Sequence, residues 1–249
     1  MAELLYGRNA VREALRAGRR RFYRLHIAEG ARGEPVEELR RLAGQRRVPV
    51  LPAGRQELDR RVEGNHQGVM LEAGPYPYVD LDVVFASAES RGEPPLILML
   101  DHLQDPQNAG TLLRTAEIVG VHGVILPDRR SLSITPAVVN SSAGAVEHLN
   151  IVKVTNLAQT ILQLQEHGIW VVGLEDDPRA KDYDAIDLSG PLAIVVGAEG
   201  PGLARLVRER CDLLVRLPMR GQIASLNAAV AGSILLYQLW RGRQRKTGA

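Results

Sequence analysis

The second half of the chain alternates short apolar runs with segments of helical periodicity, and this alternation restricts the possible folds more than any other feature. The apolar runs occupy residues 96–100, 122–127, 149–154, 169–175, 192–197 and 213–218. Helical patterns fall between them, and the last helical pattern spans residues 225–240. Strands that alternate with helices favour an α/β fold with a parallel sheet covered on both faces.

The first 74 residues show a shorter version of the same alternation. Helical patterns at 9–18, 35–47 and 55–62 alternate with predicted strands at 22–28, 48–51 and 67–73. Residues 75–94 then contain three prolines and scattered polar residues, which fits a linker that holds one short helix. We therefore predict a small α/β domain at 1–74, a linker at 75–94 and a larger domain at 95–249.

Several classes of protein are disfavoured by composition. No run of eighteen apolar residues occurs, and the N-terminus lacks the apolar centre of a signal peptide, so we expect a cytoplasmic protein without a membrane span. The single cysteine, Cys211, excludes an intramolecular disulfide and a cysteine-rich metal site. The six histidines show no spacing typical of metal ligands, and His102 is interpreted as a surface or helix-end residue. No metal is therefore expected.

The charge is distributed unevenly along the chain. Residues 1–74 contain 15 arginines and 10 acidic residues, a net charge of +5, whereas the rest of the chain is net negative. The segment RAGRRRFYR, residues 16–24, mixes arginines with Phe22 and Tyr23, which suits phosphate pairing and base stacking. A solvated helix end explains this segment equally well. The RNA-binding candidates are Arg8, Arg20, Arg21 and Arg24.

Polar residues and glycines follow three of the predicted strands. These segments are residues 101–114, 197–202 and 218–227. Ligands of parallel sheets bind beyond the carboxyl ends of the strands, so the three segments predict one site. Turns and helix caps alone would explain the glycines, Asn108 and Ser225. They would not require Arg114, Glu199 and Asn227 as well.

The same segments lack the common signatures of other site types. No glycine-rich dinucleotide motif, phosphate-binding loop or serine nucleophile elbow is present. The acidic pair Asp176 and Asp177 is interpreted as a solvated loop. A site made of amides, hydroxyls, one glutamate and one arginine suits the binding of a cofactor beside a second reactant.

Three sequence motifs resemble, in order and spacing, those of the SpoU/TrmH class of SPOUT RNA methyltransferases. They are DPQNAGTLLRTA at 105–116, VVGAEGPGL at 195–203 and LPMRGQIASLNAAVA at 217–231. The segments LYGRNAVREAL and HQGV also resemble the substrate domain of the subgroup that methylates a guanosine in 23S rRNA. In the segment NSSAGA, Asn140 stands where a lysine is more usual, which we expect to affect RNA contact.

The resemblance implies 2′-O-methylation of ribose with S-adenosylmethionine (AdoMet), a homodimer, a trefoil knot in the C-terminal domain and a ribosomal-protein-like RNA-binding domain before it. It implies catalytic roles for Asn108, Arg114, Glu199, Ser225 and Asn227. It implies cofactor contacts for Gly197, Gly200, Leu217, Met219 and Leu226. A guanidinium stays protonated in proteins, so we expect Arg114 to hold phosphate and stabilise the developing alkoxide rather than act as a base.

Two alternatives stay open beside 23S rRNA as the substrate. One is a methyltransferase that acts on tRNA, although the N-terminal α/β domain argues against it. The other is a non-catalytic RNA-binding protein with the same fold, which the intact set of Asn108, Arg114, Glu199 and Asn227 disfavours.

Overall fold

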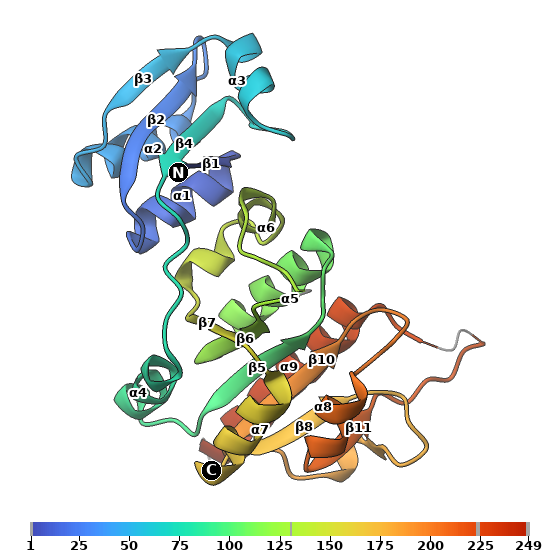
Figure 1. Cartoon of the computed structure of the whole chain (residues 1–249). Helices are drawn as coiled ribbons and strands as arrows, with labels where there is room; N and C mark the ends of the chain where they lie inside the picture. The colour runs from blue at the N-terminus through green and yellow to red at the C-terminus, as the bar shows by residue number, and fades with distance from the viewer. Residues whose placement is uncertain (1, 130, 223–224, 248–249) are drawn as a thin grey trace. The chain divides into compact units, whose positions relative to one another are not determined.

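A computed structural model describes residues 2–129, 131–222 and 225–247, which form two compact units (Figure 1). The first unit contains Met1–Pro77 together with Ile134–His148, and the second contains Tyr78–Ser133 together with Leu149–Ala249. The predicted domain division at residues 74 and 95 stays a prediction. No sequence pattern pointed to the grouping of residues 134–148 with the N-terminal segment.

The first unit is built on a four-stranded sheet in the order β1-β4-β2-β3. Its strands are β1 (Glu3–Tyr6), β2 (Phe22–Ala28), β3 (Val50–Ala53) and β4 (Val69–Ala73), and its helices are α1 (Arg8–Ala17), α2 (Glu34–Gln45) and α3 (Arg55–Arg61). Strand β4 is antiparallel to β1 and β2, whereas β2 and β3 are parallel. The predicted α/β class of this unit is confirmed, and the direction of its strands, for which the sequence carries no pattern, is mixed.

Residues 134–148 join the first unit through a buried ion pair. They contain α6 (Pro136–Ser141) and the 3₁₀ helix η1 (Ala145–His148). The Arg20 guanidinium donates hydrogen bonds of 2.9 and 2.7 Å to the two carboxylate oxygens of Glu147, and one of 2.5 Å to Glu3. The side chains of Arg20 and Glu147 are almost fully buried. Asn140 also donates to the carbonyl oxygen of Tyr6 at 3.0 Å, so its amide serves packing inside this unit.

The second unit contains a seven-stranded sheet in the order β7-β6-β5-β10-β8-β11-β9, and every paired strand in it is parallel. The strands are β5 (Leu96–Asp101), β6 (Gly123–Pro127), β7 (Ile151–Val154), β8 (Trp170–Leu174), β9 (Lys181–Asp182), β10 (Leu192–Gly197) and β11 (Leu213–Arg216). The predicted α/β class with a parallel sheet is confirmed. The two-residue strand β9 was not predicted. The knot stays a prediction.

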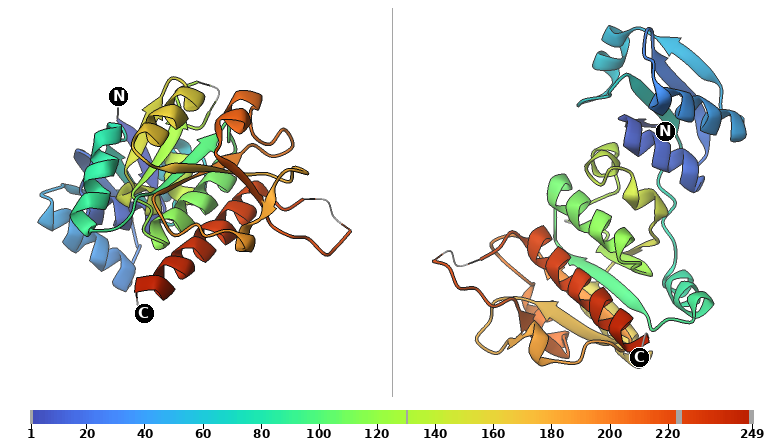
Figure 2. Two further views of the ribbon diagram at one scale, coloured as in Figure 1. Left: turned by 90° about the horizontal axis from the view of Figure 1, so that it is seen from below. Right: turned by 180° about the vertical axis from the view of Figure 1, so that it is seen from behind.

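Helices cover both faces of this sheet (Figures 1 and 2). The helices are α4 (Leu81–Arg91), α5 (Pro106–Ile118), α7 (Leu157–Glu166), α8 (Arg205–Arg210) and α9 (Ala228–Thr247), with a 3₁₀ turn η2 at Tyr183–Ala185. Residues from α4, α7 and α8 share one buried cluster with β5 side chains such as Ile97 and Met99. On the other face α5 packs against α9, where a Cβ on Gly232 would lie 2.9 Å from Leu112. None of the described helices is long and apolar enough to cross a membrane.

Candidate active site

Strand register brings the predicted motif segments to one edge of the second sheet. Gly197 at the end of β10 pairs with Asp101 at the end of β5, and Val196 pairs with Leu174 at the end of β8. Leu174 also pairs with Val215 near the end of β11. Because these strands are parallel, the segments that follow them all leave the sheet at its carboxyl edge.

A cavity of about 490 Å³, which we call the strand-end cavity, lies at this edge. Its lining comes from residues 174–176 after β8, 196–202 around the end of β10, 216, 217 and 219 after β11, and 225–228 and 231 at the start of α9. All five predicted cofactor contacts line it, namely Gly197, Gly200, Leu217, Met219 and Leu226. A cavity of this size is typical of small-molecule sites.

The segment 198–202 folds into a tight turn that forms one wall of the strand-end cavity. The N–H of Gly202 donates to the carbonyl of Ala198 at 3.0 Å, and Gly200 and Gly202 have φ of 82° and 68°, which glycine adopts without strain. A Cβ on Gly197 would lie 2.4 Å from the backbone of Gly202. Glycine at 197 is therefore required by the chain's own turn. A valine there would displace the turn, so this position cannot report on ligand binding alone.

Three of the predicted catalytic residues form one hydrogen-bonded group. The Asn227 side-chain N–H₂ donates to Oδ1 of Asn108 at 2.9 Å and to Oε1 of Glu199. Oδ1 of Asn227 accepts from the backbone N–H groups of Ala229 and Val230 at 3.0 and 3.1 Å, so Asn227 caps α9. The cap of α5 is Asp105, which accepts from the N–H of Asn108 at 3.0 Å. The Asn108 side chain therefore takes no part in capping α5.

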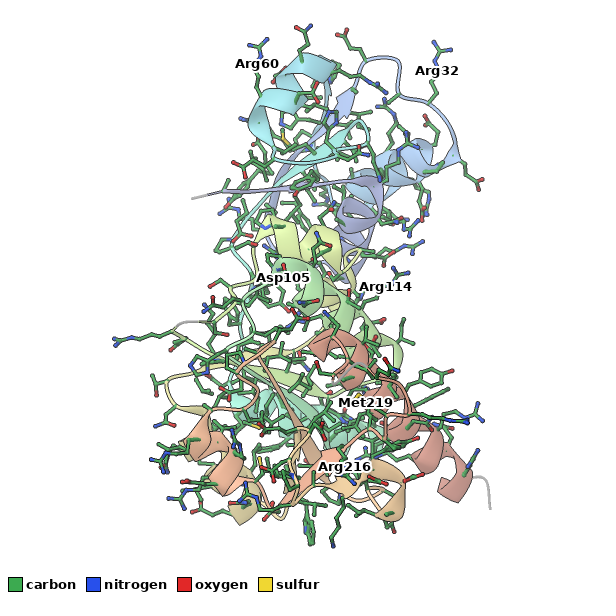
Figure 3. The ribbon with its side chains drawn as sticks, turned by 90° about the vertical axis from the view of Figure 1, so that its right-hand side faces the viewer. Arg32, Arg60, Asp105, Arg114, Arg216 and Met219 are labelled. Atoms are coloured by element: carbon green, nitrogen blue, oxygen red, sulfur yellow. The ribbon has the colours of Figure 1, made fainter. Side chains whose placement is uncertain are left out.

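The other two predicted catalytic residues, Ser225 and Arg114, are not part of this hydrogen-bonded group. Ser225 lines the strand-end cavity, whereas Arg114 lies on the exposed face of α5 (Figure 3) and does not line this cavity. Among the described residues Arg114 has no hydrogen-bond or ion-pair partner. Its catalytic role stays a prediction.

Comparison with protein families decides the class of this site. Residues 95–237 match the family model described as SpoU rRNA Methylase family, and residues 4–79 match the model described as RNA 2′-O ribose methyltransferase substrate binding. The chain belongs to the SpoU family. The predicted resemblance is confirmed, and RNA methyl transfer is the activity of this family.

Two similar proteins align with nearly the whole of this SpoU chain, and a third aligns with a smaller part of it. A protein of Bacillus subtilis named as a TrmH family tRNA/rRNA methyltransferase, YacO, is 42% identical over 97% of this chain and 96% of its own. The crystal structure of the SpoU methyltransferase AviRb from Streptomyces viridochromogenes, in complex with AdoMet, aligns with a TM-score of 0.80 and 25% identity over 98% of this chain and 90% of that chain. The TrmH/SpoU tRNA modifying enzyme of A. aeolicus aligns with a TM-score of 0.57 and 27% identity over 62% and 78%.

The four arginines expected to bind RNA lie in different environments within the substrate-binding unit of this SpoU protein. Arg21 and Arg24 are exposed, and the Arg21 guanidinium lies 5.5 Å from the ring centroid of the exposed Tyr23. Nε of Arg8 donates to the carbonyl of Gln67 at 3.1 Å. Arg20 is buried against Glu147 and Glu3, so its guanidinium is not available to RNA, and we remove it from the candidate set.

Two acidic residues that line the strand-end cavity, Glu175 and Asp176, were not predicted from the sequence. Asp176, interpreted as part of a solvated loop, lines the cavity beside Glu175. Asp176 is itself exposed, whereas only 12% of the Asp177 side chain is exposed, and hydrogen bonds from Arg179 hold the pKa of the Asp177 carboxyl below its ordinary value. The position of Asp176 directly after a strand end was the signal that could have identified it.

Cysteine and metal chemistry have no support in the described part of this SpoU chain. Burial, followed by the charge of Asp212, raises the pKa of the Cys211 thiol to about 12, so a thiolate nucleophile is not formed near neutral pH. Among the described residues no three His, Cys, Asp or Glu side chains gather closely enough to hold a metal ion.

Proposed function

We propose that this protein transfers a methyl group from AdoMet to the 2′-hydroxyl of a ribose, in a guanosine of 23S rRNA, in the cytoplasm. The observation that carries the proposal is the Asn108–Asn227–Glu199 group at the rim of the strand-end cavity. The match of residues 4–79 to a substrate-binding model of RNA 2′-O ribose methyltransferases supports the ribose as the acceptor.

The lining of the strand-end cavity fits AdoMet chemically. AdoMet combines an adenine, a cationic sulfonium and an amino acid end. Leu174, Leu217, Met219 and Leu226 offer apolar surface to the adenine. Asp176 and Glu199, together with Glu175, which pairs with Arg208 at 2.9 Å, place carboxylates in this lining, and opposite charge attracts the cationic groups of AdoMet. When bound, AdoMet would supply an already activated methyl group.

This placement of AdoMet is testable at the apolar lining. Met219→Ala and Leu226→Ala should each weaken AdoMet binding in calorimetric titration, because each removes apolar contact area. Leu206→Ala is the matched control, since Leu206 on α8 is also an exposed apolar residue, at 53% against 39% for Met219 and 45% for Leu226, but does not line the strand-end cavity. Unchanged affinity in both cavity variants would remove the cofactor from this cavity.

The hydrogen bonds of Asn108 and Asn227 leave one side-chain donor that can position the ribose. Asn227 is fixed, because its oxygen binds the N-terminus of α9 while its nitrogen donates to Asn108 and Glu199. The Asn108 oxygen is occupied by this bond, so its own N–H₂ remains to donate. That donor can hold a ribose oxygen, and positioning is the main contribution that a site can make toward an activated donor.

The catalytic role proposed for Arg114 depends on a homodimer. Helix α9 exposes Val230, Ile234 and Tyr237 at a spacing that places them on one face, and Ile118 is exposed on the adjacent α5. We propose that a second copy of the chain covers this apolar face. Arg114 lies one helical turn before Ile118 and would then stand at the dimer interface, where its guanidinium can hold a phosphate and the developing alkoxide.

The substrate proposal rests on the extent of the similarity. AviRb aligns with 98% of this chain, and so with both units, whereas the tRNA modifying enzyme of A. aeolicus aligns with only 62%. The experiment is methyl transfer from labelled AdoMet to 23S rRNA, 16S rRNA and total tRNA in parallel reactions. Label in 23S rRNA alone is expected. Label in tRNA alone would establish the tRNA alternative, and RNA binding without label would establish the non-catalytic one.

A further inference from the structure

A pocket of about 570 Å³, which we call the β2 pocket, lies on the sheet of the first unit. Its lining includes residues 21–24 at the start of β2, Arg47 and Pro49 before β3, and Glu72 near the end of β4. The backbone N–H of Leu25 donates to the carbonyl of Pro49 at 2.9 Å, which holds the first two segments side by side. The volume is within the range of ligand sites.

The backbone of β2 is irregular where it lines the β2 pocket. The register with β4 shifts between Phe22 and Arg24, which marks a β-bulge. In a regular strand the neighbours Tyr23 and Arg24 would point to opposite faces of the sheet, but both are exposed and both line this pocket. A bulge redirects side chains in this way, and bulges are frequent beside functional sites.

Arg47 has an unusual backbone conformation at the same pocket. Its φ is 56°, in the left-handed region that glycine adopts freely and other residues rarely adopt. It ends helix α2, where its N–H donates to the carbonyl of Gly44 at 3.0 Å and the N–H of Val48 donates to that of Ala43 at 2.8 Å. Glycine is the usual residue at such a position. Strain of this kind persists mainly where the side chain has a function that offsets it.

The β2 pocket carries positive charge that its own residues do not neutralise. Arg21, Arg24 and Arg47 are exposed and line it. Within the part of the chain that the structure describes, the guanidinium groups of Arg21 and Arg47 have no hydrogen-bond or ion-pair partner. Arg24 lies 3.8 Å from Glu72, but that carboxylate binds Arg61 more closely, at 2.7 Å. The pocket therefore suits an anion.

We propose that the β2 pocket binds one unpaired nucleotide of the RNA substrate, and the proposal rests on the proposed function. Arg21, Arg24 and Arg47 hold its phosphate, and its base stacks on Tyr23. The Tyr23 ring is 38% exposed, and the Arg21 guanidinium lies 5.5 Å from its centroid, so charge and aromatic surface lie together. A base inside a duplex is already stacked between its neighbours, so the nucleotide must be unpaired.

This contact is separate from the one expected at Arg8. Nε of Arg8 donates to the carbonyl of Gln67, which precedes β4, whereas Glu72 of the β2 pocket lies near the end of β4. The five residues of β4 span about 17 Å. Arg8 and the β2 pocket would therefore contact different nucleotides.

The test measures the binding of a short fluorescent single-stranded RNA of mixed sequence, and of a duplex of the same length, to the full chain. Tyr23→Ala should weaken binding of the single strand on the order of 10-fold, as loss of one stacked base does. It should leave duplex binding unchanged. Tyr23→Phe keeps an aromatic ring and should bind like the wild type.

A salt series separates the phosphate contact from the stacked base. Arg47→Gly should weaken binding and reduce the slope of log affinity against log salt by about 0.7, the value for one phosphate of a single strand. Its melting temperature should equal or exceed that of the wild type, because glycine relieves the strained φ. Tyr23→Ala removes no charge, so it should keep the wild-type slope.

Arg41→Ala is the matched control. Arg41 is an exposed arginine on α2 in the same unit, it has no hydrogen-bond or ion-pair partner among the described residues, and it does not line the β2 pocket. This variant should keep the wild-type affinity and slope.

The proposal would be overturned by a Tyr23→Ala variant that binds the single strand as the wild type does, even if Arg47→Gly binds more weakly. Equal losses for single strand and duplex would overturn it too, because a stacked, unpaired base would then not be involved. Each of these results concerns binding and leaves the proposed function intact. A wild-type protein that binds the single strand but methylates no ribose would instead overturn the proposed function.

Discussion

Asn227 donates a hydrogen bond of 2.9 Å to Asn108 across 119 positions of the chain, and the same asparagine caps helix α9 through its oxygen. One side chain thus connects the third motif to the first and also starts the last helix. Its structural and functional roles can be separated, because they use different atoms.

Replacement of Asn227 by alanine or aspartate should separate these roles. Asn227→Ala loses the cap and should lower the free energy of unfolding by about 1 kcal/mol. Asn227→Asp keeps an acceptor for the α9 N–H groups, so its stability should stay near that of the wild type. It cannot donate to Asn108, however, and it repels Glu199, so methyl transfer should fall on the order of 10²-fold. Thermal unfolding and methylation rates test both statements. A fully active Asn227→Asp variant would contradict the role assigned to the hydrogen-bonded group.

The neighbouring residues Arg20 and Arg21 should behave in opposite ways. Arg20→Ala leaves Glu147 buried without its partner and should destabilise the protein by about 3–5 kcal/mol. Arg21→Ala should leave stability unchanged and weaken RNA binding, because Arg21 is exposed beside Tyr23. RNA affinity should also depend less steeply on salt in Arg21→Ala, as loss of a phosphate contact requires. Equal RNA affinity of Arg21→Ala and wild type over a salt series would exclude Arg21 from the RNA contact.

Stability should fall in mild acid because of His122. Burial, followed by the charge of Arg91, holds the pKa of His122 below its ordinary value, and Nδ1 accepts the N–H of Leu96 at 3.0 Å. The unfolded chain, with a histidine pKa of about 6.5, takes up this proton first. The stabilisation is therefore complete above that pH and is lost progressively as the pH falls from there through the lowered pKa of the folded protein. Denaturant unfolding from pH 8 to 5 should show a smaller loss in His122→Gln than in wild type. Identical pH dependence of the two proteins would contradict a neutral, buried His122.

Arg114 should act through its charge and its planar shape. Arg114→Ala should abolish methyl transfer and leave AdoMet binding intact. Arg114→Lys keeps the charge but loses the paired N–H geometry, so it should recover little activity. The measurement is single-turnover methylation at saturating RNA across a pH range. A lysine variant that overtakes wild type at high pH would indicate that residue 114 acts as a base, because lysine deprotonates more readily than arginine.

The sequence was sufficient to predict most of the second unit. Its major strands coincide with the apolar runs of the sequence, and their carboxyl ends identified the segments that line the strand-end cavity. The short strands β1 and β9 were missed, because so few residues show no clear periodicity. The packing of residues 134–148 depends on Arg20 and Glu147, which lie 127 positions apart. Such tertiary contacts have no local sequence pattern.

The contact of 2.5 Å between Asp101 and His102 was also not predictable. A histidine that follows a strand is usually a surface residue, and neither the positive φ of His102 nor the burial of Asp101 can be read from residue types. The strained backbone became visible only in the structure.

The most direct test of the account is the position of the methyl group in the product. 23S rRNA should be incubated with AdoMet and the wild-type protein, and then examined by alkaline hydrolysis and mass spectrometry of the nucleosides. A methyl group on the 2′-oxygen removes the hydroxyl that alkaline cleavage requires, so one alkali-resistant linkage and 2′-O-methylguanosine are expected. Neither should form with Asn227→Asp. A methyl group on a base, with every linkage still cleaved by alkali, would contradict the account.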